Sequence, residues 1–196
     1  MPALPELAIA AALAWGSGLR LYACLFLVGL AGHLGWVELP QHLHLLQSPM
    51  VLAASGFMSC VEFFADKLPW VDSLWDAVHT FIRIPAGAAL AAAVFGDAGG
   101  GAMLAAAIVG GSVAGGTHLG KAGARAVLNT SPEPVSNWAA SLTEDAVLPA
   151  GLWLAALHPA IFFVFLGVQI ILAVVLLRWI LKGLALLLRK LRTAGG

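Results

Sequence analysis

The sequence contains little charge: Asp, Glu, Lys and Arg together make up 10% of the 196 residues, whereas hydrophobic residues make up 61%. A soluble domain of ordinary composition carries roughly 25% charged residues. With less than half of that share, the chain lacks the polar surface needed to face water on all sides. The composition therefore excludes an ordinary soluble fold and predicts an integral membrane protein surrounded by lipid.

Neither sign of charge is in excess, because ten Lys and Arg residues balance ten Asp and Glu residues. A balanced chain gives no reason to expect a nucleic-acid partner. Basic residues cluster at the C-terminal end, where Arg189, Lys190 and Arg192 lie close together. Such a group is typical of residues that flank a membrane helix at the lipid–water interface.

Cysteine is also scarce. The two cysteines, Cys24 and Cys60, lie inside apolar runs and have no CxxC spacing. The sequence therefore excludes a disulfide framework or a cysteine-based zinc site and predicts two buried free thiols.

Long apolar runs dominate what remains, and turn residues divide them. A helix needs about 20 mostly apolar residues to cross a bilayer. We therefore predict an all-α fold, a polytopic bundle of about six transmembrane helices that forms a single transmembrane domain over residues 1–196. The predicted spans are about 7–34, 49–67, 70–95, 102–128, 135–157 and 159–188.

The positions of Lys and Arg predict the orientation of these spans. On a six-span model the turns near 67–70 and 129–134 and the basic C-terminus lie on one side, whereas the segments 35–48 and 96–101 contain no Lys or Arg. Because basic loops remain in the cytoplasm, both termini are predicted to be cytoplasmic.

A weak internal repeat links the middle spans. Pro85 and Pro149 each stand in a Pro-Ala-Gly sequence, late in the third and fifth spans. Proline inside a helix removes a backbone hydrogen bond and permits a bend. Spans two and three and spans four and five are thus predicted to form two similar Pro-kinked hairpins, an arrangement found in transporters.

The ionisable residues follow helical spacing. Asp72, Asp76, His79 and Arg83 recur at intervals of four, three and four, which places them on one face of a helix. Each charge at mid-membrane costs roughly 2.5–3.5 kcal/mol, so polar stripes must face one another or a water-filled cavity. Three more spans carry such stripes, and their members are predicted to join the same solute- or ion-binding site in the cytoplasmic half: Glu62 and Asp66; His118, Lys121 and Arg125; Asn137, Glu144 and Asp145.

Two ligand types suit parts of this set. Two carboxylates and an imidazole, from Asp72, Asp76 and His79, could bind a divalent cation such as Mn, Zn or Fe, although the adjacent Arg83 counts against a metal. Alternatively, Arg83 and its basic neighbours Lys121 and Arg125 could hold a phosphate or carboxylate. No cofactor is certain.

Arg20 stands apart from these stripes, near the middle of the first span and directly after Gly16-Ser17-Gly18-Leu19. Either the first helix is locally unwound there, or Arg20 forms a salt bridge with the acidic stripe.

Two stretches resemble an uncharacterised bacterial family of integral membrane proteins, domain of unknown function 4126. They are EFFADKLPWVDSLWDAVHTFIR at 62–83 and GGTHLGKAGARAVLNTSPEPVSNWAASLTED at 115–145. The resemblance implies a small multi-pass protein of the bacterial cytoplasmic (inner) membrane, and no activity or catalytic residue is carried over from it.

The leading functional hypothesis is a transporter or channel for a small charged or polar solute or ion. One alternative is a membrane-embedded, metal-dependent enzyme that acts on a lipid phosphate. A second is a structural or assembly protein whose charges form internal salt bridges. The expected partners are the lipid bilayer, the solute or ion, and further copies of the chain in a homo-oligomer.

Overall fold

A computed structural model describes residues 3–68, 70–130 and 134–194, with the side chains of 134 and 184–194 excepted, so the basic side chains of Arg189, Lys190 and Arg192 lie outside the described part. The described chain contains helices and no strand, which confirms the predicted all-α bundle. Its elements are α1 (Leu4–His33), η1 (Gln41–Gln47), α2 (Pro49–Ala65), α3 (Val71–Val94), η2 (Gly96–Ala98), α4 (Gly100–Leu128), α5 (Pro134–Leu157) and α6 (Pro159–Ala194), where η marks a 3₁₀ helix.

Within the described residues, four helices are long and apolar enough to cross a membrane: α1, α3, α4 and the part of α6 up to Gly183. The pair η1 and α2, which bends by 66°, would make a fifth span. Large apolar side chains such as Phe81 and Met50 are more than four-fifths exposed, as expected of surfaces that contact lipid. These features support a membrane protein with about the predicted number of helices.

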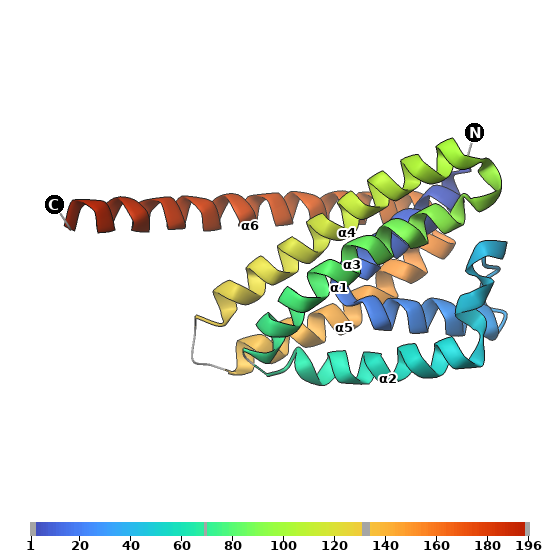
Figure 1. Cartoon of the computed structure of the whole chain (residues 1–196), viewed down its shortest axis with the longest axis horizontal. Coiled ribbons are helices and arrows are strands. Elements are labelled where there is room, and N and C mark those ends of the chain that lie inside the picture. The colour runs from blue at the N-terminus through green and yellow to red at the C-terminus, as the bar shows by residue number, and fades with distance from the viewer. Residues whose placement is uncertain (1–2, 69, 131–133, 195–196) are drawn as a thin grey trace.

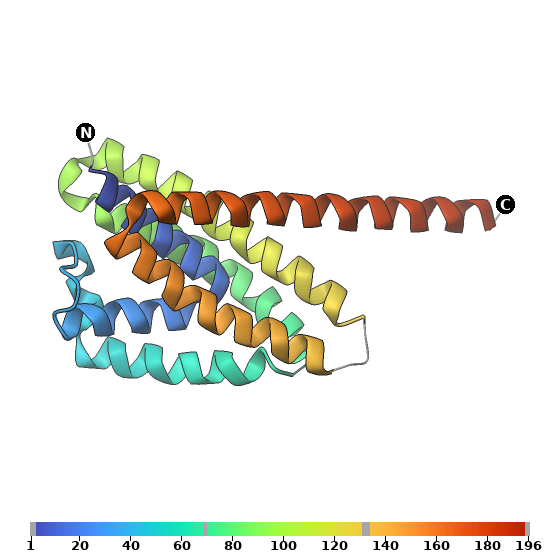
Figure 2. The ribbon, with the colours of Figure 1, turned by 180° about the vertical axis from the view of Figure 1, so that it is seen from behind.

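The first helix does not cross the bundle as one rod. Arg20 has extended backbone angles (φ −149°, ψ 91°), which divide α1 into two half-helices, residues 4–19 and 21–33. Figures 1 and 2 show the second half-helix folding back, so that both ends of α1 lie at the same end of the bundle. We call this re-entrant element the α1 hairpin and Arg20 its tip.

Close contacts between the two half-helices support the reversal. A Cβ atom on Gly16 would lie 2.7 Å from the Sγ atom of Cys24. In a straight helix, residues eight apart are separated by about 12 Å along the axis. Gly18 brings the hairpin equally close to α4, because a Cβ there would lie 2.3 Å from the backbone oxygen of Ala114. The small residues before Arg20 thus let the chain turn inside a crowded bundle.

Helices α2 to α6 run alternately between the two ends of the bundle (Figures 1 and 2). We call the end where α2 meets α3 and α4 meets α5 the charged end, and the opposite end, with η1 and η2, the loop end. The N-terminus lies at the loop end and the C-terminus beyond the charged end (Figure 1). The chain thus begins and ends at opposite ends of the bundle, because the segment 7–34, predicted as one crossing, reverses at Arg20. The membrane side of each terminus stays a prediction.

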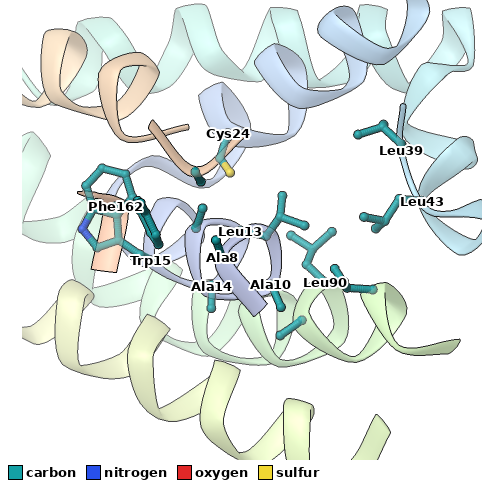
Figure 3. Close-up of a cluster of buried hydrophobic side chains, with 14 of the residues drawn as sticks. Ala8, Ala10, Leu13, Ala14, Trp15, Cys24, Leu39, Leu43, Leu90 and Phe162 are labelled. Atoms are coloured by element: carbon teal, nitrogen blue, oxygen red, sulfur yellow. The ribbon is translucent and has the colours of Figure 1, made fainter. Parts of the chain in front are cut away.

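The apolar core surrounds the first half-helix of α1. Ala8, Ala14 and Leu13 are at most 1% exposed, and the small size of the two alanines lets neighbouring helices approach closely. Trp15 packs edge-to-face against Phe162 and Phe165 of α6, with ring centroids 6.3 and 5.3 Å apart. Figure 3 shows this cluster extending across the loop-end half to residues of the second half-helix, η1 and α3.

Two smaller expectations can be compared with this fold. Cys24 is buried, as predicted, but Cys60 is exposed. An apolar run in a membrane helix faces lipid as well as the core, so an apolar neighbourhood does not imply burial. Pro85 and Pro149 lie inside α3 and α5, each of which extends through its proline. The internal repeat stays a prediction.

The reversal of α1 predicts a disulfide that a straight helix could not form. In Gly16→Cys, the new Cβ would lie 3.3 Å from the Cβ of Cys24, close to the roughly 3.5–4.5 Å typical of disulfides. With the exposed Cys60 replaced by Ser, we expect this variant to form an intramolecular disulfide under a membrane-permeant oxidant, detected by intact-mass and free-thiol measurements. Adding Cys24→Ala should abolish the bond. Persistently free thiols in a folded variant would contradict the hairpin.

Candidate functional site

The polar stripes of α2, α3, α4 and α5 converge in the charged-end half, where they meet the tip of the α1 hairpin. Lys121 Nζ lies 3.9 Å from Asp76 Oδ1, and Arg125 Nη1 lies 3.9 Å from Asp72 Oδ2. The prediction that these stripes face one another is thus confirmed. The ion-paired side chains, here called the charged cluster, are Arg20, Glu62, Asp66, Lys67, Asp72, Asp76, Arg83, Lys121, Arg125, Glu144 and Asp145.

The deep part of the cluster centres on Arg83 of α3. Its Nη2 atom donates to Glu62 Oε1 at 2.7 Å, and its Nη1 atom donates to Asp76 Oδ1 at 2.9 Å. Both carboxylates and the guanidinium are almost fully buried. A single cation therefore bridges two buried acids from neighbouring helices.

His118 of α4 completes this deep part. Arg83 Nη1 lies 3.1 Å from His118 Nδ1, and His118 Nε2 lies 2.7 Å from Thr80 Oγ1. Because a guanidinium only donates, Nδ1 accepts and the ring proton lies on Nε2. Thr80 can accept that proton's hydrogen bond, since its own hydroxyl donates to the backbone oxygen of Asp76 at 2.9 Å. The partners thus specify a neutral imidazole.

The centre of the cluster joins α1, α2, α4 and α5. Asp66 Oδ2 accepts from Lys121 Nζ at 2.7 Å and lies 3.1 Å from Arg20 Nη2. Lys121 also lies 3.2 Å from Glu144 Oε2. Arg20 reaches Asp145 Oδ1 at 2.9 Å and donates to the Ser141 hydroxyl at 2.9 Å. These contacts hold the tip of the α1 hairpin against α2 and α5.

Residues nearer the charged end are held by amides as well as by charges. Arg125 donates to the backbone oxygen of Asp66 at 3.0 Å and to the side-chain oxygen of Asn137, and it lies 3.1 Å from Glu144. Asn129 donates to both oxygens of Asp72, at 2.9 and 3.2 Å. The most exposed carboxylates of the cluster are on α5, where the Glu144 and Asp145 side chains are 14% and 26% exposed.

The break in α1 adds backbone groups to the site. A helix end leaves carbonyl groups without partners and carries partial negative charge. Lys121 Nζ donates to the carbonyl of Leu19, at the end of the first half-helix, at 3.2 Å. Both interpretations of Arg20 therefore hold: the helix is unwound there, and Arg20 is paired with acids.

Several side chains of the site were not among the predicted site residues. Arg20 and Lys67 were assigned to the interior of the first span and to a turn, and Ser141 and Asn129 are neutral. The sequence nevertheless contained a sign of each residue's role. Ser141 and Asn129 continue the helical spacing of the polar stripes on their helices. Arg20 and Lys67 supply positive charge that the acids of the stripes need.

His79 lies apart from the ion pairs. Its Nε2 atom is 3.3 Å from the Tyr22 hydroxyl, its Nδ1 atom is 2.8 Å from the Trp75 carbonyl, and its ring stacks on Trp75. Asp72 and Asp76 are meanwhile directed to Asn129 and Arg83. Asp72, Asp76 and His79 therefore do not converge, and no group of three His, Cys, Asp or Glu side chains suited to a metal occurs in the described chain. The divalent-cation alternative was wrong, because side chains on one face of a helix need not converge on a single point where a metal ion could bind.

The anion alternative meets a different obstacle. Arg83, Lys121 and Arg125 each already face at least one carboxylate within 3.2 Å. A phosphate or carboxylate ligand would have to displace these internal acids, so the basic groups do not form a ready anion site.

Many polar atoms of the cluster nevertheless lack a hydrogen-bond partner. Buried groups without a partner cost free energy, and such atoms usually contact water, protons or ligands. The buried atoms of charged residues that have neither a hydrogen bond nor an ion-pair contact are Glu62 Oε2, Asp66 Oδ1, Asp76 Oδ2 and Arg83 Nε.

Comparison with known proteins gives a family without an assigned activity. A family model described as "Domain of unknown function (DUF4126)" matches residues 7–179. No curated protein and no solved structure matches the chain.

The salt bridges of Arg20 predict that the substitution Arg20→Met strongly destabilises the fold. Removing this cation leaves Asp66, Glu144 and Asp145 with less compensation, and breaking a buried pair costs about 3–5 kcal/mol. We expect a large fall in the thermal unfolding temperature in detergent, and a smaller fall for Arg20→Lys, which keeps the charge but not the forked geometry.

The exposed pair of His42 and Asp97, 3.1 Å apart, provides the control for Arg20→Met. His42→Ala should change stability by no more than about 1 kcal/mol, because exposed ion pairs contribute little. Equal effects of the two substitutions would show that Arg20 does not anchor the hairpin.

Proposed function

The chain belongs to the DUF4126 family, and we propose that it is a membrane transporter or channel for a small charged or polar solute or ion that moves through the charged cluster. The observation that carries this proposal is the meeting of a broken, re-entrant helix with buried charges at Arg20. Interrupted helices at membrane depth are tolerated where the freed backbone lines a cavity or is buried in protein. In transporters, such interruptions form the sites for solutes and ions.

Partial exposure of one side of the cluster supports a pathway. Glu144 and Asp145 of α5 are partly exposed, whereas Glu62 and Arg83 are fully buried, so the cluster extends from a partly exposed side into the interior. The unpartnered polar atoms between them favour water in this region. A charged solute entering from this side would exchange water contacts for these groups.

A barrier toward the loop end is the second requirement. The first half-helix of α1 fills that half with tightly packed small residues, including Ala8 and Ala14, which are 0% exposed. Passage of a solute therefore requires the α1 hairpin to move relative to α3, α4 and α6. Its single break at Arg20 and its salt bridges to α2 and α5 make it a discrete element that binding could displace.

A structural or assembly role is the second candidate. The observation that favours it is that every charged side chain of the cluster has an oppositely charged neighbour. The enzyme alternative has less support, because the aspartates that would hold its metal are directed to Asn129 and Arg83.

The proposal includes an orientation in a bacterial inner membrane. Lys67, Lys121 and Arg125 belong to the charged-end half, whereas segments 35–48 and 96–101 of the loop end have no Lys or Arg. The charged end then faces the cytoplasm and the N-terminus faces outward. The matching positions of the α2–α3 and α4–α5 turns support the proposed repeat (Figure 1), and copies of the chain could assemble through its lipid-facing helices.

Cysteine labelling tests this orientation. In a Cys60→Ser background, Ala3→Cys and Ala98→Cys should react with an impermeant thiol reagent added to intact cells, and Thr130→Cys should react only after permeabilisation. All three positions are exposed. The opposite pattern at Ala98 and Thr130 would reverse the orientation, and protection of Ala3 alone would place the N-terminus on the cytoplasmic side.

Flux measured with stability on the same samples separates transport from a structural role. Under the transport proposal, Asp76→Asn and Glu144→Gln abolish solute or ion flux in proteoliposomes while the protein still inserts and purifies as a folded sample. Under the structural alternative, loss of one partner of a buried pair costs about 3–5 kcal/mol and the fold is lost first.

His42→Ala is the matched control, since its pair with Asp97 is exposed and lies outside the cluster. It should preserve both flux and the unfolding temperature. Loss of stability in Asp76→Asn and Glu144→Gln, with no flux of any tested ion or small anion in the parent protein, would end the transport proposal.

A further inference from the structure

The charged cluster divides into a balanced part and an unbalanced part. Four carboxylates, Asp66, Asp72, Glu144 and Asp145, lie among four cations, Arg20, Lys67, Lys121 and Arg125. The remaining members are Glu62, Asp76 and Arg83. This acid–arginine trio contains two carboxylates and one cation, so its formal charge is −1.

The second cation near the trio, Lys121, is shared with acids of the balanced part. Lys121 Nζ is 3.9 Å from Asp76, but it lies at 2.7 Å from Asp66 and 3.2 Å from Glu144. His118 accepts a hydrogen bond from Arg83 through Nδ1, so its ring is neutral. The trio therefore keeps one negative charge in excess.

One oxygen of each acid is also without a partner. Glu62 Oε2 and Asp76 Oδ2 are buried and accept no hydrogen bond, although the other oxygen of each carboxylate accepts from Arg83. Glu62 is 0% exposed and Asp76 is 2% exposed. An uncompensated charge at such a depth is costly, and two carboxylates that share a site resist ionising together.

We propose that the acid–arginine trio binds one proton, carried by either Glu62 or Asp76. Protonation forms one O–H bond on a carboxylate oxygen, takes the proton from water reached from the partly exposed side of the cluster, and brings the trio to neutrality. A proton fits better than a metal ion, because the described carboxylates and imidazoles do not converge on a common point. On the proposed transport function, this proton is the transported or coupling ion.

The charged and titratable groups that surround the trio come from α1, α4 and the end of α2. They tune its proton affinity without removing the excess charge, since they are either neutral or paired with groups outside the trio. These groups are Arg20, Tyr22 and Cys24 of α1, Asp66 of α2, and His118 and Lys121 of α4.

Infrared spectroscopy of the purified full-length protein tests for the proton directly. At neutral pH the protein should show the carbonyl-stretch band of one protonated carboxylic acid, shifted by exchange into D₂O and lost at alkaline pH. Glu62→Gln and Asp76→Asn should each remove this band, because either change leaves one acid and one cation. These variants should also retain the unfolding temperature within about 2 °C.

Asp145→Asn and Asp97→Asn are the matched controls. Asp145 pairs with Arg20 and Lys67, neither of which pairs with an acid of the trio, so Asp145→Asn should lower the unfolding temperature and retain the band. Asp97 is exposed and should affect neither measurement. Absence of the band in the parent protein, or its persistence in Glu62→Gln or Asp76→Asn, would overturn the proton site.

The infrared band tests the proton site, and the flux tests the transport function, so either proposal can be overturned without the other. A band that behaves as expected in a protein without any flux supports the proton site and removes the transport function. Flux in a protein without the band supports transport and removes the proton site. Proteoliposomes with an imposed pH gradient then connect the two, since Asp76→Asn should abolish flux driven by that gradient.

Discussion

The need to neutralise charge inside an apolar bundle is the constraint on which this structure depends. Ionised side chains are expensive in a medium of low dielectric constant unless an opposite charge and hydrogen bonds are close by. Cations of the cluster are neutralised by acids on other helices. Arg20 joins α1 to α2 and α5, and Arg83 joins α3 to α2. Lys121 joins α4 to α1, α2 and α5. The helices are thereby fixed in their arrangement by the groups that are hardest to bury.

Ion pairs of this kind contribute little net stability compared with apolar packing, but they discriminate strongly between correct and incorrect arrangements. Apolar packing and ion pairing occupy different halves of the bundle. The loop-end half contains the alanine-rich half-helix of α1, whose Trp15 packs against Phe162 of α6, whereas the charged-end half contains the cluster. The α1 hairpin spans the boundary, since its body lies in the first region and its tip in the second. On the proposed transport function, a ligand or proton that changes the charge of the cluster would act on the element proposed to close the loop end.

Much of the site could be predicted because helical spacing is local. Asp72, Asp76 and Arg83 lie on one face whatever the rest of the chain does, and the cost of exposing them to lipid requires the stripes to meet. What spacing could not supply was the partner of each charge. His79 shares the face of Asp72 and Asp76, yet it stacks on Trp75 and hydrogen-bonds Tyr22, so the metal interpretation failed.

The sequence by itself determined the medium, the helical class and the polar stripes, because composition and periodicity depend on neighbours along the chain. The tertiary structure alone decided that the first apolar segment reverses at Arg20, since the glycines and the arginine at 16–20 predicted local unwinding or a salt bridge but not the direction of the chain beyond them. The reversal depends on distant groups: Asp66, Ser141 and Asp145 bind the guanidinium, and Lys121 binds the freed carbonyl of Leu19. Only when those helices surround Arg20 does the lost helical hydrogen bonding find replacement, which is why the end of the bundle at which the N-terminus lies could not be predicted from the sequence.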